Sequence, residues 1–98
     1  MSEKKAKKGQ CQVTLDGVTF VFRKPTLEEY EDYQEKRNTN LRRPGPAYRE
    51  LAQRCLVDQT QLDALQKAFE ANAAVPLTIA NALAELAGID IEITVGKD

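Results

Sequence analysis

Histidine is absent from this chain of 98 residues, and cysteine occurs only twice. The chain therefore lacks the side chain that proteins use most often as a general base and as a metal ligand. Two thiols without histidine cannot complete a standard zinc site. The five glycines are scattered, so there is no glycine-rich phosphate loop. We expect no catalytic activity, no cofactor and no metal site.

Long apolar runs are also missing. No stretch approaches the roughly 18 apolar residues of a transmembrane helix, and no apolar segment follows the first residues as in a secretory signal. The net charge of −1 favours no particular partner. Lysines at positions 4, 5, 7 and 8 make the start basic, and we predict a disordered basic tail over residues 1–10. Residues 11–98 are predicted to form a single α+β domain.

Residues 11–23 show the pattern of a β-hairpin. Asp16 and Gly17 suit a type I′ turn, because both tolerate positive φ. A lone hairpin is at best marginally stable in water, so its apolar face is expected to rest on helices. A two-residue loop places six residues on that face, in three pairs across the strands: Leu15 with Val18, Val13 with Phe20, and Cys11 with Phe22.

A helix is predicted over residues 27–37, directly after the hairpin. Pro25 disfavours helix before it, Thr26 suits the N-cap, and Glu29 three residues later completes a capping box. Apolar residues at helical spacing predict three more helices, within residues 46–57, 60–71 and 76–88. Thr60 is predicted to cap the third helix, and Gly88 is predicted to follow the last one as its C′ residue.

Residues 89–95 are predicted to form a strand, because apolar and polar side chains alternate there. This strand either joins the hairpin as a third strand or remains an edge for a partner. Cys11 lies on the predicted hairpin and Cys55 on a predicted helix, both at apolar-face positions. We predict them to be free, small buried hydrophobes rather than a disulfide.

Two groups of charged residues have a functional and a plainer interpretation. The acidic residues at positions 28, 29, 31 and 32 are a candidate metal or acid–base cluster, but the helix dipole favours carboxylates in the first turns, and a solvated helix face explains them. Arg37, Arg42 and Arg43 could contact phosphates. The slightly negative net charge and the lack of a recognisable module argue against nucleic-acid binding.

The order of these elements resembles a known family. The stretch VTLDGVTFVFRKPT over residues 13–26 is similar to the opening of small tail assembly chaperones from long-tailed bacteriophages, in which a short hairpin precedes a helix rich in acids and tyrosine. An "L…CLV" helix over residues 51–57, a helix over residues 62–69 and a proline-started helix over residues 76–88 follow in the same order. The resemblance covers residues 11–88.

The resemblance implies a protein without catalysis that binds the tape measure protein of the phage tail, keeps it soluble and assists tail tube assembly. It also implies contacts with the tail tube protein and with a frameshifted longer form of the chain. Its place of action would be the host bacterial cytoplasm, with no membrane contact and with absence from the mature virion. The alternative is a small phage structural tail component or a DNA-binding regulator.

Two sets of residues are candidates for partner binding. Tyrosine offers a large contact area with a polar tip, and an exposed strand can pair with a strand of another protein. Ordinary core packing is the competing interpretation for both sets. The candidates are Leu27, Tyr30 and Tyr33 on the first helix, and Ile89, Ile91, Ile93 and Val95 on the last strand.

Overall fold

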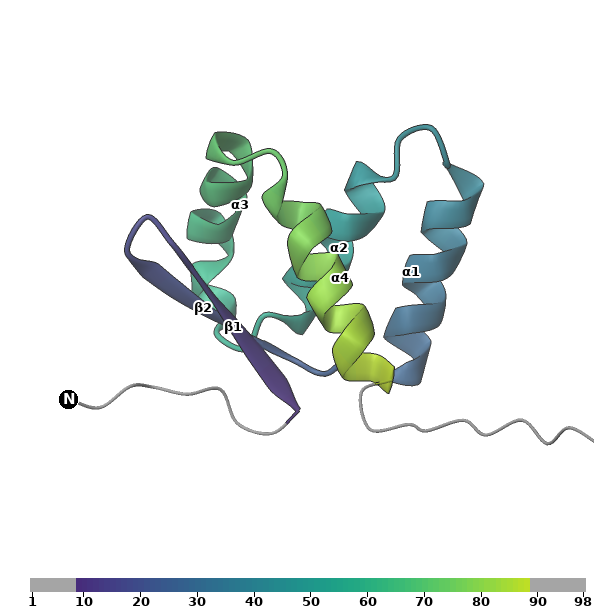
Figure 1. Cartoon of the computed structure of the whole chain (residues 1–98), viewed down its shortest axis with the longest axis horizontal. Coiled ribbons are helices and arrows are strands. Elements are labelled where there is room, and N and C mark those ends of the chain that lie inside the picture. Colours follow the sequence, from purple (N-terminus) through teal and green to yellow (C-terminus); the bar gives the residue numbers. More distant parts are fainter. Residues whose placement is uncertain (1–8, 89–98) are drawn as a thin grey trace, which may run out of the picture.

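The computed structural model describes residues 9–88. A two-stranded antiparallel sheet precedes four α-helices, which confirms the predicted α+β class (Figure 1). In Figure 1 the hairpin and α3 lie on one side, α1 lies on the other, and α2 and α4 fill the middle. The elements are β1 (Gln10–Leu15), β2 (Val18–Arg23), α1 (Leu27–Thr39), α2 (Gly45–Cys55), the 3₁₀ turn η1 (Gln59–Gln61), α3 (Leu62–Ala71) and α4 (Val75–Gly88).

The hairpin has the predicted register. Asp16 and Gly17 have φ values of 51° and 83°, as a type I′ turn requires. Because the turn holds only these two residues, Leu15 pairs with Val18, and the pairing continues without a bulge to Gln10 and Arg23. β1 therefore begins one residue before the predicted start of the domain. Of the predicted tail over residues 1–10, residues 1–8 lie outside the described residues, and Gln10 belongs to β1.

The start of α1 confirms the predicted capping box. The Thr26 hydroxyl accepts a hydrogen bond from the Glu29 backbone N–H at 3.1 Å, and the Glu29 carboxylate accepts one from the Thr26 N–H at 3.0 Å. These two bonds satisfy backbone donors that the first helical turn leaves without partners. The helix continues two residues beyond the predicted end and stops at Thr39.

Two predictions about helix ends are wrong. Thr60 does not cap a helix. It lies inside η1, and its backbone N–H and hydroxyl both donate to Asp58, whose carboxylate lies two residues earlier and caps this turn instead. Gly88 is the last residue of α4, and its φ is not in the left-handed range that a C′ glycine adopts. The predicted strand over residues 89–95 lies outside the described residues.

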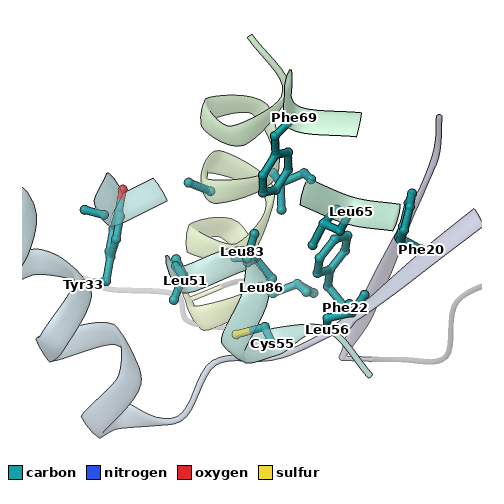
Figure 2. Close-up of a cluster of buried hydrophobic side chains, with 14 of the residues drawn as sticks. Phe20, Phe22, Tyr33, Leu51, Cys55, Leu56, Leu65, Phe69, Leu83 and Leu86 are labelled. Carbon is teal, nitrogen blue, oxygen red and sulfur yellow. The ribbon is translucent and has the colours of Figure 1, made fainter. Parts of the chain in front are cut away.

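The core lies where the apolar face of the hairpin meets the helices. Phe20 and Phe22 are 1% and 0% exposed and pack among leucines from α2, α3 and α4 (Figure 2). A β-bridge between Phe22 and Leu56 joins the end of α2 to β2. The two cysteines are free thiols, as predicted, with Cys55 buried and Cys11 half-buried. The sheet thus depends on the helices, since the hairpin alone would be only marginally stable.

Candidate partner-binding surface

The predicted binding residues of α1 have different environments. Leu27, the first residue of the helix, is 76% exposed, whereas Tyr33 is 6% exposed and belongs to the core. The Tyr33 ring lies 5.5 Å from that of Tyr30 and 6.3 Å from that of Tyr48 on α2, with the Arg37 guanidinium 5.7 Å from its centroid. The structure therefore brings the tyrosines together but leaves Leu27 in solvent. Their role in partner binding stays a prediction, and the four candidates after Gly88 lie outside the described residues.

An ion-pair cluster joins β2, α1 and α2, and sequence reasoning missed it. Both guanidinium nitrogens of Arg23 donate to the Glu29 carboxylate, at 2.8 and 2.7 Å. Arg23 also donates to the backbone carbonyl of Arg54 at 2.8 Å. The Arg54 side chain in turn donates to Asp32 at 3.1 Å. A bidentate arginine–carboxylate pair is among the stronger ionic contacts in proteins, so this cluster holds three elements together.

Electrostatics within the cluster follow from this geometry. The hydrogen bonds from Arg23 lower the pKa of Glu29 to about 2, against the opposing effect of partial burial. The hydrogen bonds to Glu29 and to Asp32 raise the pKa values of Arg23 and Arg54, respectively. Burial and the nearby Glu29 charge raise the pKa of the Cys55 thiol to about 11. Cys55 is therefore protonated and weakly nucleophilic at neutral pH, and the cluster is suited to a structural role.

The turn between α1 and α2 carries a different set of charges. Arg42 and Arg43 are exposed and Arg49 is half-buried, and they surround an open depression of about 430 Å³. Among the residues that the structure describes, none of these three guanidinium groups pairs with a carboxylate. Leu41, which directly precedes Arg42 in the chain, has 71% of its surface exposed. We call Leu41, Arg42, Arg43 and Arg49 the arginine surface.

A second depression, of about 450 Å³, lies at the base of the hairpin. Its lining includes Arg23, Arg54 and Val57, of which Val57 is 49% exposed. Here the two guanidinium groups are already bound to Glu29 and Asp32. A ligand at this position would have to compete with those carboxylates, whereas no carboxylate within residues 9–88 pairs with the donors of the arginine surface. The arginine surface is therefore the stronger candidate for binding a negatively charged partner.

Residues 9–88 also lack the features of two other kinds of site. Within residues 9–88, no three or more carboxylate or thiol groups are gathered in a way that could hold a metal ion. None of the helices in this range is long and apolar enough to cross a membrane. Every buried side-chain nitrogen and oxygen atom described has a hydrogen-bond partner. The exposed arginines and leucines thus remain the surface features that call for a functional explanation.

Comparison with known proteins identifies one family. A family model described as a domain of unknown function (DUF6848) matches residues 10–96. No curated protein and no solved structure gives a significant match. The matched range begins at the first residue of β1 and runs through α4 into the segment that follows it.

Proposed function

The chain belongs to the DUF6848 family of domains of unknown function, and we propose that this member is a tail assembly chaperone of a long-tailed bacteriophage. It binds the tape measure protein without catalysis and keeps that protein soluble while tube subunits gather around it. The proposal also includes contacts with the tail tube protein and with a frameshifted longer form of the chain. The place of action is the host cytoplasm, and the chain leaves before the virion is complete.

The proposal draws its phage context from the ordered resemblance over residues 11–88. The observation that carries the binding function is the arginine surface. Leu41, which is 71% exposed, directly precedes two arginines in the chain that have no carboxylate partner among the described residues. Burial of a leucine side chain in an interface contributes roughly 1.5–3 kcal/mol, and arginine is common among the residues that dominate interfaces.

The chemistry of this surface defines the partner segment that fits it. An apolar side chain of the partner would cover Leu41, and carboxylates on either side would pair with Arg42 and Arg43. Such pairing accelerates association and sets the register between the partners more than it adds affinity. A helical segment of the tape measure protein with acidic residues around an apolar one meets this description. The surface is therefore suited to holding a helical client until tube subunits replace it.

A DNA-binding regulator is the second candidate, and the same arginines favour it. Arg42, Arg43 and Arg49 could neutralise phosphates, in which case affinity would fall steeply with salt concentration. Exposed Leu41 has no evident part in phosphate binding, which makes the protein partner the better fit. A structural tail component, the other alternative, would remain in the finished particle.

The test is co-expression with the very long, helix-rich protein encoded downstream, followed by size-exclusion chromatography. The wild-type chain should make that protein soluble and co-elute with it. Leu41→Asp and the double change Arg42→Glu/Arg43→Glu should each weaken the complex at least tenfold, or about 1.4 kcal/mol. The matched controls are Leu77→Asp, at a leucine of α4 that is 44% exposed, and Lys67→Glu on the exposed side of α3. Both controls should bind as wild type does.

Three results would contradict the proposal. In the first, the long protein stays insoluble while this chain elutes alone. In the second, purified virions contain the chain in stoichiometric amount. In the third, the chain would bind duplex DNA in fluorescence anisotropy, with an affinity that falls steeply with salt and is lost in Arg42→Glu/Arg43→Glu. The second result would support a tail component, and the third would support the regulator.

A further inference from the structure

The two edges of the hairpin differ in how their backbone groups are satisfied. In an antiparallel pair, alternate residues direct both N–H and C=O away from the partner strand. On β2 two of the outward carbonyl groups have partners. The Val21 carbonyl accepts from the Val57 N–H at 2.9 Å, and the Thr19 carbonyl accepts from the Gln61 side chain at 3.2 Å. The outer edge of β2 is therefore covered by the chain between α2 and α3.

The outer edge of β1 is open in the described structure. Gln12 pairs with Val21 and Thr14 with Thr19, so the backbone groups of Gln12 and Thr14 point outward. Within residues 9–88, neither residue has a backbone hydrogen bond on that side. β1 also contains no proline and no charged residue, the usual means by which proteins protect an edge strand. This edge is ready to pair with another strand.

The apolar face next to this edge is incompletely covered. On β2, Phe20 and Phe22 are almost fully buried. On β1, Cys11, Val13 and Leu15 pack against the same core but remain half-buried. A strand added beside β1, with apolar side chains on the same face, would cover these three residues. The core thus has room for apolar side chains on the side where the backbone edge is open.

The chain itself supplies a segment with the required pattern. Apolar residues occupy every second position from Ile89 to Val95, with Asp90, Glu92 and Thr94 between them. The seven residues would extend over about 23 Å, against about 20 Å for the six residues of β1. The family match runs to residue 96, so this segment is part of the shared domain rather than an appendage to it.

The end of α4 is close to the open edge. α4 packs against β1, and Leu86, in the last turn of α4, lies in the same part of the core as Phe22 (Figure 2). Phe22 is the residue that pairs with Cys11 near the start of β1. The chain therefore leaves α4 near the start of β1, and a strand that began there and followed the edge would run parallel to β1.

We propose that residues 89–95 pair with the outer edge of β1 as a third, parallel strand of the sheet. Ile89, Ile91, Ile93 and Val95 then cover the half-buried apolar residues of β1, while Asp90 and Glu92 lie with Gln12 and Thr14 on the other face. The hydrogen-bonding groups of Gln12 and Thr14 gain backbone partners. This arrangement closes the sheet edge within the chain, and it holds whether or not the partner is a phage tail protein.

Amide hydrogen exchange of the full chain, followed residue by residue by NMR, tests the proposal. The N–H groups of Gln12 and Thr14 have no acceptor in the hairpin, so an added strand that accepts their hydrogen bonds should slow their exchange. We expect each to exchange at least tenfold more slowly in the wild-type chain than in Ile91→Lys/Ile93→Lys. The control variant Asp90→Lys/Glu92→Lys changes the opposite face of the segment and should keep the protection. The Val13 N–H, which faces β2, should stay protected in every variant that folds.

If the lysine variant does not fold, measurements on the wild-type chain alone still test the proposal. Nuclear Overhauser contacts between residues 11–15 and 89–95 are expected, and free exchange of the Gln12 and Thr14 amides would overturn the proposal. Protection that rises with protein concentration, together with a dimer in sedimentation, would overturn it in favour of edge pairing between two copies. Protection that appears only on addition of the long downstream protein would overturn it in favour of a strand from that partner.

Discussion

Replacement of Glu29 by glutamine is the sharpest test of the ion-pair cluster. The change keeps the size of the side chain but removes the charge that faces Arg23 at 2.7 Å and Arg54 at 3.9 Å. The Glu29 side chain is only 12% exposed, whereas that of Arg23 is 39% exposed, so solvent screens this contact in part. A pKa of about 2 in place of the ordinary 4.5 corresponds to about 3 kcal/mol at neutral pH. We expect Glu29→Gln to lower the free energy of unfolding at pH 7 by at most this amount, because solvent weakens the pair with the partly exposed Arg23.

The pH dependence of stability provides a second readout of the same contact. Because folding lowers the pKa of Glu29, its contribution is complete above about pH 4.5 and is lost as the pH falls from 4.5 toward 2. Urea unfolding, followed by circular dichroism, should show that the wild-type protein loses this contribution within that window. The Glu29→Gln variant has no carboxyl group at this position, so it should not show this loss of stability. The difference between the two proteins should therefore disappear near pH 2.

Glu28→Gln is the matched control for this experiment. Glu28 is the neighbouring acid in the first turn of α1, is exposed and has no ion pair among the described residues. Loss of its favourable interaction with the helix dipole should cost less than about 1 kcal/mol. Equal urea midpoints for the two variants, with the same pH dependence as wild type, would refute the reasoning. Such a result would mean that Arg23 and Arg54 stabilise the charged Glu29 carboxylate no more than water does.

Three further predictions concern the core, the cap and the thiols. Phe20→Ala should lower the free energy of unfolding by about 3–5 kcal/mol, because the ring is 1% exposed; an unchanged urea midpoint would mean that the ring is not packed in the core. Thr26→Ala should cost about 1 kcal/mol through loss of the hydrogen bond to the Glu29 N–H, and a thermal melt identical to wild type would contradict this. With a thiol reagent at pH 8, half-buried Cys11 should react well before Cys55, whose pKa is raised to about 11; equal rates in the native protein would contradict the burial of Cys55.

Local chemistry explains why much of the fold could be predicted from the sequence. The Asp16-Gly17 turn sets the register of the hairpin, because only a few residues tolerate positive φ at both central positions. Thr26 and Glu29 are three residues apart, so the capping box forms whenever a helix starts at Leu27. Where two local signals compete, such reasoning fails. Asp58 and Thr60 are both suited to capping, and the structure uses Asp58.

Contacts between distant residues determined the rest, and no local pattern predicts them. Glu29 is one of several acids in α1, and it becomes the centre of an ion-pair cluster only because packing brings Arg23 and Arg54 to it. Tyr33 is buried because α2 places Tyr48 beside it. Local signals in the sequence were sufficient to predict the hairpin with its register and the four helices in their order, since these depend on residues a few positions apart. Which charged side chains pair, and which, like those of Arg42 and Arg43, have no carboxylate partner within residues 9–88, depends on the surfaces that meet when the helices pack.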